Sequence, residues 1–213
     1  MSNIAVVDYG IGNLLSVKRS LEYCGANVTI TSSPEIILNS EKVVLPGVGA
    51  FPVGMKSLES YGLVDVIRNV AKNGTPLLAI CLGMQLLFEE SEEFEDTKGL
   101  GLIPGKVIQI PVAGPLNEPL KRPHIGWNSL KYPEILGNWE GSILQDNQFG
   151  ESVYFVHSYM AKLASPENLL AEVEYGQYKI PAVVFKDKII GCQFHPEKSG
   201  EIGLKILRNF NVK

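Results

Sequence analysis

Short apolar runs alternate with amphipathic stretches along the first half of the chain. The runs at Ile4–Asp8 and Leu77–Ile80 are nearly continuous, which is typical of strands buried on both faces of a parallel sheet. Apolar positions recur at helical spacing over Leu14–Cys24, and Gly25 follows as a candidate helix end. The same criteria predict strands at Val28–Thr31 and Val43–Leu45 and helices at Leu58–Lys72 and Leu82–Glu89. This alternation predicts an α/β fold of three layers, an open and mostly parallel sheet with helices on both faces.

The second half of the chain is richer in strands. Lys186–Lys188 separates two of them as a hairpin turn does, so we expect extra antiparallel strands here. The Pro-rich segment Pro111–Pro123 is predicted to be a surface loop, and a last helix is predicted at Gly200–Phe210. The predicted strands are Lys106–Ile110, Asn128–Leu130, Val153–Tyr159, Leu169–Glu174, Ala182–Phe185 and Ile189–Phe194. No repeat or linker divides the chain, so a single domain over residues 1–213 is expected.

Composition and charge fit a globular chain and exclude several functions. Of 213 residues, 45% are hydrophobic and 20% charged, which is ordinary for folded proteins. The formal net charge of −4 argues against nucleic-acid and anionic-membrane binding. The longest apolar stretch, Pro76–Phe88, falls short of the roughly 20 residues of a membrane span. Three cysteines without metal-ligand spacing indicate neither a disulfide framework nor a metal site, so we expect a reducing cytoplasm.

Much of the negative charge is local. Between Glu89 and Asp96, six of eight residues are carboxylates. Runs of like charge are usually solvated, so this run is predicted to be an exposed helix end and loop, with a cation site as the alternative.

The segment Ala79–Gln85 (AICLGMQ) joins a predicted buried strand directly to a predicted helix. Cys81 lies at the junction, with small residues two positions away on either side at Ala79 and Gly83. This is the layout of a nucleophile elbow, a sharp turn that exposes the nucleophile above the sheet. A helix N-terminus also favours the thiolate form of a cysteine. The segment therefore predicts Cys81 as a nucleophile, with a buried structural cysteine as the alternative.

A cysteine nucleophile needs a base, and the chain has three histidines. His195 ends an apolar strand, and Glu197, two residues later, is placed to orient its imidazole as the third member of a triad does. His157 lies inside an apolar run without a carboxylate nearby and is predicted to be a packing or backbone-binding histidine. His124 follows a proline and is predicted to be a surface or capping histidine.

An oxyanion hole needs fixed N–H groups. The N–H of Leu82 directly follows the candidate nucleophile, and the glycine-rich loop Pro46–Gly54, which begins with PGVG, can bring its backbone close to a ligand. An ordinary strand-to-helix turn is the alternative for that loop. The glycines of Gly10–Leu15 (GIGNLL) lack the third glycine of a dinucleotide-binding fingerprint, so no cofactor is predicted from them.

Taken together, AICLGMQ, PGVGAF, QFHPE and the predicted parallel sheet resemble the class I, or triad, glutamine amidotransferases. Four further motifs are similar to the glutaminase subunits of imidazole glycerol phosphate synthases. They are DYGIGN (Asp8–Asn13), HIGWN (His124–Asn128), YFVHSY (Tyr154–Tyr159) and HPEKS (His195–Ser199). The resemblance covers essentially the whole chain, although these families often have glycine where Ala79 stands.

The resemblance implies a site and a reaction. Cys81 would attack the side-chain amide of L-glutamine, His195 would transfer the proton, and Glu197 would orient His195. The oxyanion would be held by the N–H of Leu82 and, after a peptide rearrangement in the PGVG loop, by the loop's backbone at Val48 and Gly49. The other residues implied to bind glutamine are Gly47, Gln85, Ser158 and Tyr159. No cofactor or metal is implied.

The resemblance also implies a partner, because this chain holds no second catalytic domain. The partner would be a (β/α)₈ synthase subunit, bound as a heterodimer, that uses the ammonia to make imidazole glycerol phosphate and aminoimidazole carboxamide ribotide in histidine biosynthesis. The partner would switch on an otherwise poor glutaminase. The residues implied to face it are Asn13, Trp127, Tyr154 and Lys198.

The sequence also has three alternative interpretations. Paralogous subunits of this kind supply ammonia to an amidating partner in surface-polysaccharide biosynthesis, and the motifs do not separate the two pathways. HIGWN and HPEKS argue against an amidotransferase of the anthranilate or guanylate type. The presence of Cys81, His195 and Glu197 argues against a non-catalytic scaffold with this fold.

Overall fold

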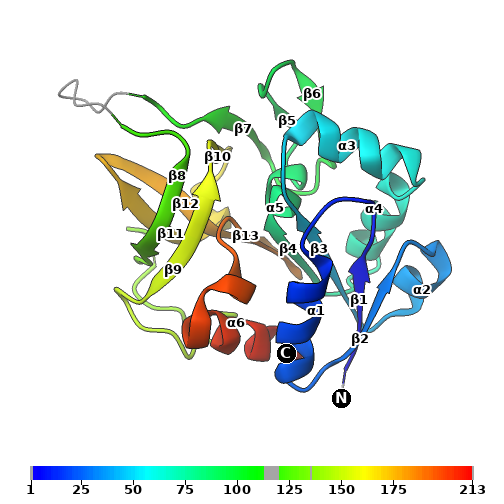
Figure 1. Ribbon diagram of the computed structural model, residues 1–213. Helices are drawn as coiled ribbons and strands as arrows, with labels where there is room; N and C mark the ends of the chain where they lie inside the picture. Colours follow the sequence, from blue (N-terminus) through cyan, green and yellow to red (C-terminus); the bar gives the residue numbers. More distant parts are fainter. Residues whose placement is uncertain (1, 113–119, 135, 213) are drawn as a thin grey trace.

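A seven-stranded sheet runs through the centre of the protein (Figure 1). The computed structural model describes residues 2–112, 120–134 and 136–212. In spatial order, the strands are β11 (Leu169–Tyr175), β12 (Tyr178–Lys186), β13 (Ile189–Cys192), β4 (Leu77–Cys81), β3 (Lys42–Gly47), β1 (Asn3–Val7) and β2 (Asn27–Thr31). From β13 to β2 all neighbours are parallel, whereas β12 and β11 extend one edge as antiparallel strands.

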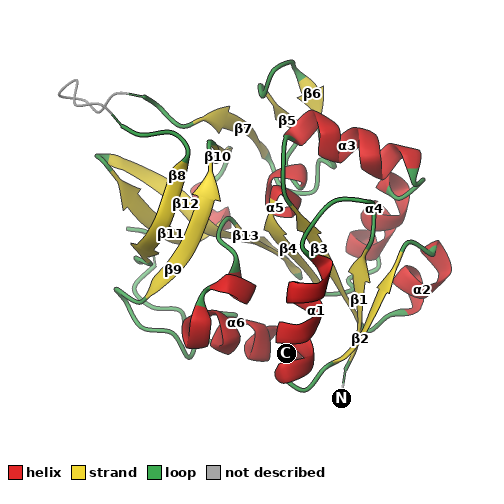
Figure 2. Cartoon of the chain, in the orientation of Figure 1, coloured by secondary structure: helices red, strands yellow, loops and turns green. Residues whose placement is uncertain are grey.

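Helices cover both faces of this sheet (Figure 2). Successive side chains of a strand point to opposite faces, and in β1 this places Ile4 and Val6 in one core and Ala5 and Val7 in the other. The first core also takes residues from α1 (Leu14–Tyr23) and α6 (Gly200–Val212). The second core takes residues from α2 (Pro34–Asn39), α3 (Phe51–Ser60), α4 (Val64–Lys72) and α5 (Leu82–Leu86). The predicted three-layer α/β fold is confirmed.

The second half adds two smaller sheets. One has the order β10 (Tyr159–Leu163), β7 (Gly105–Gln109), β5 (Glu90–Ser91) and β6 (Thr97–Lys98). The other pairs β8 (His124–Ser129) with β9 (Ser152–His157). Most of these pairs are antiparallel, as predicted. Two short 3₁₀ helices complete the described chain, η1 (Pro166–Asn168) and η2 (Pro196–Lys198).

Local chemistry explains why α1 begins where it does. The side chain of Asn13 accepts a hydrogen bond from the backbone N–H of Ser16 at 3.4 Å, which satisfies one of the unpaired donors of the first turn. Val17 and Leu21, four residues apart, are buried on the face that meets the sheet. Asn13 itself is exposed.

Several predicted boundaries were wrong. The helix predicted at Leu58–Lys72 is two helices, because Gly62 with φ +67° ends α3 before α4 starts. The loop predicted to reach Gly54 ends earlier, since α3 begins at Phe51. The helix predicted at Leu82–Glu89 ends at Leu86, and α2 was not predicted.

The single strand predicted at Val153–Tyr159 is interrupted at Ser158 and divides into β9 and β10. The turn predicted at Lys186–Lys188 does join β12 to β13. Of the loop predicted at Pro111–Pro123, residues 113–119 lie outside the described residues.

Candidate active site

Cys81 is the last residue of β4 and directly precedes α5. Its φ of 54° and ψ of −110° are rare for a residue other than glycine, so the backbone turns sharply and under strain at this position. The turn also requires the small residue after it. A Cβ on Gly83 would lie 2.0 Å from the carbonyl oxygen of Leu45. The strand-to-helix elbow inferred from the sequence is therefore present, with the Cys81 thiol at its apex.

The PGVG loop starts beside this elbow. Gly47 ends β3 and is the register partner of Cys81. Tyr9 anchors the loop, because its hydroxyl donates a hydrogen bond to the carbonyl of Pro46 at 2.8 Å. Beyond the strand, Val48 is 41% exposed and Gly49 has φ +103°, a conformation that favours glycine. The loop thus presents its backbone next to the thiol.

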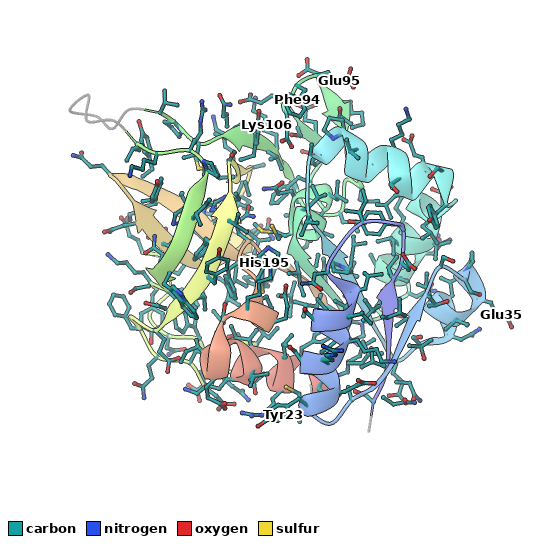
Figure 3. All side chains as sticks on the ribbon, viewed as in Figure 1. Tyr23, Glu35, Phe94, Glu95, Lys106 and His195 are labelled. Atoms are coloured by element: carbon teal, nitrogen blue, oxygen red, sulfur yellow. The ribbon has the colours of Figure 1, made fainter. Side chains whose placement is uncertain are left out.

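His195 reaches the same place from β13. It follows that strand, directly precedes η2, and lies near the middle of the view in Figure 3. Its Nδ1 is 2.8 Å from Oε1 of Glu197, and both side chains are almost fully buried. Within the described part of the chain, His195 Nε2 and Glu197 Oε2 have no hydrogen-bond partner. The imidazole is therefore oriented by Glu197 and keeps Nε2 free for a reacting group.

The surroundings of His195 favour its charged form. Burial lowers the pKa of this imidazole, but its interactions with the Cys81 thiolate and the Glu197 carboxylate outweigh burial and raise the pKa to about 9. With a pKa of about 9, the His195 ring is mostly protonated near neutral pH.

The elbow, the PGVG loop and His195 line one cavity of about 260 Å³. Gly47 ends the strand next to it and Glu197 lies behind His195, so neither lines the cavity. Eight of the residues implied to act on glutamine do line it, namely Val48, Gly49, Cys81, Leu82, Gln85, Ser158, Tyr159 and His195.

The other two histidines lie together at the side of this cavity, and His157 itself lines it. His157 is buried and its Nδ1 is 2.8 Å from the backbone carbonyl oxygen of Tyr159, so its prediction as a backbone-binding histidine is confirmed. The prediction of a surface or capping role for His124 was wrong. Its ring is 3% exposed and stacks on Phe155 and Tyr175, at centroid distances of 5.0 and 4.1 Å.

The acidic run is only partly solvated. Phe94 and Glu95 are at the outer rim in Figure 3. Glu93, however, is 8% exposed, lines the cavity, and accepts a hydrogen bond from the backbone N–H of Phe51 at 2.7 Å. Burial raises the pKa of this carboxyl group above its ordinary value. A fully exposed run was therefore the wrong prediction for Glu93.

The residues implied to face a partner lie outside the cavity. Trp127 and Tyr154 are register partners across β8 and β9, their ring centroids are 6.1 Å apart, and Trp127 is 59% exposed. The backbone N–H of Tyr154 donates to the hydroxyl of Ser199, next to the exposed Lys198 on η2. In turn, η2 contacts α1, which Asn13 caps. Contacts thus connect β8, β9, η2 and α1.

In residues 2–112, 120–134 and 136–212, no group of three or more His, Cys, Asp or Glu side chains is placed to hold a metal ion. No helix in the same ranges is long and apolar enough to span a bilayer.

The family is decided by comparison with known proteins. The family model described as glutamine amidotransferase class-I matches residues 5–213. The chain belongs to this family. It is also 46% identical over 210 residues to imidazole glycerol phosphate synthase subunit HisH 1 of Legionella pneumophila (strain Lens), with 99% of each chain covered. It is 49% identical over 208 residues to the subunit HisH of Bacillus cereus (strain B4264), covering 97% of this chain and 93% of the relative.

Solved structures share the fold of this class I glutamine amidotransferase. A crystal structure of a glutamine amidotransferase matches with a TM-score of 0.70 at 19% identity, covering 98% of this chain and 99% of that one. The structure of PurLQS from Thermotoga maritima matches with a TM-score of 0.71 at 18% identity, covering 99% and 98%. At such identities the likeness concerns the fold alone.

Two residues of this candidate site went unnoticed in the sequence. One is Glu93, which a run of carboxylates does not distinguish from its neighbours. The other is Gln193, fully buried, whose Nε2 donates to Cys81 Sγ at 3.9 Å and whose Oε1 accepts from Gln85 Nε2 at 3.0 Å. A glutamine two residues before His195 at the end of an apolar strand was the available signal.

Proposed function

We propose that this chain is the glutaminase subunit of an imidazole glycerol phosphate synthase and hydrolyses L-glutamine to glutamate and ammonia. The observation that carries the proposal is a single cavity in which the thiol of Cys81 and the imidazole of His195, backed by Glu197, meet. The names of the relatives at 46% and 49% identity support the same assignment.

The reaction follows from the two charged groups. The Cys81 thiolate attacks the side-chain amide carbon of glutamine and forms a tetrahedral intermediate. The His195 imidazolium donates its Nε2 proton to the departing nitrogen, so ammonia leaves and a γ-glutamyl thioester remains. The neutral imidazole then accepts a proton from water, the hydroxide adds to the thioester, and glutamate leaves as the thiolate is restored. Glu197 holds the ring in place throughout.

The rest of the cavity supplies binding. We assign the oxyanion to the N–H of Leu82 and to the PGVG loop at Val48 and Gly49, after a rearrangement of that peptide. The α-ammonium of glutamine fits Glu93, a buried carboxylate that lines the cavity. We assign the remaining contacts with the substrate to Gly47, Gln85 and the backbone of Ser158 and Tyr159.

Ammonia made here needs an acceptor, so a second subunit is part of the proposal. We propose a (β/α)₈ synthase subunit that binds the face of Asn13, Trp127, Tyr154 and Lys198, in the cytoplasm, with residues 1–213 acting as one domain. Nucleic acid and membranes play no part in this account. The relatives' names favour this acceptor over an amidating enzyme of surface-polysaccharide synthesis.

The partner is also proposed to switch the site on. The DYGIGN segment contacts the PGVG loop through Tyr9 and passes close to it at Gly12. Tyr9 holds the carbonyl of Pro46, and a Cβ on Gly12 would lie 3.7 Å from the ring of Pro46. A partner that binds beside Asn13 can therefore shift the loop. Loss of one oxyanion donor typically costs about 10²–10³ in rate, so a flip of the Val48 peptide supplies much of the expected activation.

The test is the rate of glutamate release by the chain alone, with the synthase subunit, and with the subunit and its nucleotide substrate. We expect the rate to rise at each step and to vanish in Cys81→Ala, while added ammonium salt still supports synthesis of the imidazole product. A chain that hydrolyses no glutamine under any of these conditions refutes the function. Activation only by an amidating enzyme of surface-sugar synthesis refutes the pathway alone.

A further inference from the structure

A buried row of polar groups runs from β8 to the wall of the glutamine cavity. Asn128 Nδ2 is 3.4 Å from His124 Nε2, and His124 Nδ1 is 3.0 Å from His157 Nε2. His157 Nδ1 is 2.8 Å from the carbonyl oxygen of Tyr159. Both rings are buried, and the mechanism above uses neither of them.

The backbone fixes the direction of these hydrogen bonds at the Asn128 end. Asn128 Oδ1 accepts from the N–H of Ser129 at 2.8 Å, and Asn128 Nδ2 donates to the carbonyl of Glu174 at 2.8 Å. The amide orientation is therefore settled, and a donor faces His124 Nε2. That nitrogen must accept, so the proton of His124 is on Nδ1 and is donated to His157 Nε2.

The other end of the row requires the same direction. A carbonyl oxygen such as that of Tyr159 only accepts, so His157 carries its proton on Nδ1. If the hydrogen bonds ran in the reverse direction, His157 Nδ1 would carry no proton. It would then lie 2.8 Å from the carbonyl oxygen of Tyr159, with two acceptors facing each other and no proton between them. A second proton on either ring would set two N–H groups against each other. Burial agrees with this, because it lowers the pKa of His124 to about 4 and that of His157 to about 3.

We propose that His124, neutral and protonated on Nδ1, is a positioning residue for glutamine binding. It acts through His157 on the Tyr159 peptide. The carbonyl of Tyr159 accepts two hydrogen bonds, one from His157 and one from Gln85 Nε2 at 3.0 Å. These two donors fix the carbonyl of Tyr159, a residue that lines the cavity and begins β10 directly after the break at Ser158.

The proposal rests on the proposed function, since it concerns how tightly glutamine is held. Removal of the His124 N–H leaves His157 Nε2 buried without its donor, and the ring and the Tyr159 peptide lose their fixed position. Loss of such a buried hydrogen bond weakens glutamine binding, and we expect a rise in KM of about tenfold. Because His124 touches no reacting atom, kcat should change by less than about threefold.

The first experiment reads the protonation of the rings directly. Nitrogen-15 NMR of the full chain, labelled on histidine at pH 7, reports which ring nitrogen carries the proton. We expect two neutral rings protonated on Nδ1, His124 and His157, and one charged ring, His195. An Nε2–H form of either neutral ring overturns the proposal, whether or not any variant folds.

The second experiment compares three variants in glutamine hydrolysis by the chain with its synthase subunit. His124→Leu removes the donor and should show the rise in KM. His124→Asn places an N–H where Nδ1 stood and should restore KM to within about twofold of the wild type. Tyr175→Leu removes the ring stacked on His124 but leaves the row intact, and it serves as the packing control.

The outcomes separate this proposal from the function on which it rests. A wild-type KM in His124→Leu, or an equal rise in Tyr175→Leu, overturns the positioning role while glutamine hydrolysis stands. Absence of hydrolysis by the wild type overturns the proposed function and the KM prediction together. The ring protonation then still supports or overturns the row of hydrogen bonds itself.

Discussion

Gly47 and Cys81 are register partners across β3 and β4, so the end of one strand lies directly beside the nucleophile proposed on the other. A Cβ on Gly47 would lie 2.5 Å from the hydroxyl of Tyr9 and 2.9 Å from the backbone nitrogen of Gly83. The PGVG loop and the elbow therefore approach each other as closely as two backbones allow. The geometry of the site depends on glycine at positions 47 and 83.

The first prediction concerns this close approach. Gly83→Ala should lower the free energy of unfolding by about 3 kcal/mol, because the new Cβ meets the backbone oxygen of Leu45, which has no room to move. For a chain of this size, Tm should fall by about 6–12 °C. Gly137→Ala is the matched control, since nothing lies within 4 Å of its Cβ. Equal thermal melts for the two variants would contradict this packing.

The second prediction tests Glu93 as the partner of the glutamine ammonium group. Glu93→Gln keeps an oxygen for the N–H of Phe51 but removes the charge, so KM for glutamine should rise about 10- to 100-fold. Turnover at saturation should stay near that of the wild type. Glu95→Gln, in the same acidic run but exposed, is the control and should leave KM unchanged. A wild-type KM in Glu93→Gln assigns the ammonium group elsewhere.

The sequence predicted much of this fold and site because their signals are local. The continuous apolar strands, the small residues around Cys81 and the spacing of His195 and Glu197 are all short-range patterns. The errors came from long-range packing. His124 follows a proline, as surface residues often do. It is nevertheless covered by Phe155 and Tyr175, which lie in strands far along the sequence. Glu93 is buried where Phe51, at the start of α3, donates its backbone N–H to the carboxylate.

The loop predicted at Pro46–Gly54 was too long for a different reason. Its composition is typical of a loop, but Pro52 lies in the first turn of α3, where no N–H is needed. Gly54 faces α5, where a Cβ would lie 3.1 Å from a methyl group of Leu82. Close packing of two helices, rather than a turn, explains this glycine, and the sequence does not distinguish the two causes.

The third prediction follows from the charge on His195. With its pKa raised to about 9, the ring stays protonated through neutral pH and loses its proton as the pH rises through 9. Because the imidazolium must protonate the departing ammonia, kcat/KM should fall on the alkaline side near pH 9. Glu197→Gln removes one of the groups that raise this pKa, so the alkaline limb should move to lower pH. An unmoved limb in a folded variant would show that Glu197 does not act on His195.

The fourth prediction concerns Gln193. Gln193→Met keeps the volume but removes the N–H that points at Cys81 Sγ, so alkylation of Cys81 by iodoacetamide at pH 7 should slow about tenfold. Gln193→Glu should slow it further, because a carboxylate there repels the thiolate. Thermal melts control for folding. Wild-type alkylation rates in both folded variants would remove Gln193 from the site.

The central claim is that Cys81 is the nucleophile, and covalent trapping tests it most directly. A diazo-ketone analogue of glutamine is protonated at its diazo carbon, loses N₂ and forms a thioether with the attacking sulfur. The other thiols are disfavoured, since burial raises the pKa of both Cys24 and Cys192. Peptide mass spectrometry of the treated chain should find one adduct, on Cys81, which free glutamine slows and which His195→Ala nearly abolishes. An adduct on Cys24 or Cys192, or none on Cys81, would contradict the account.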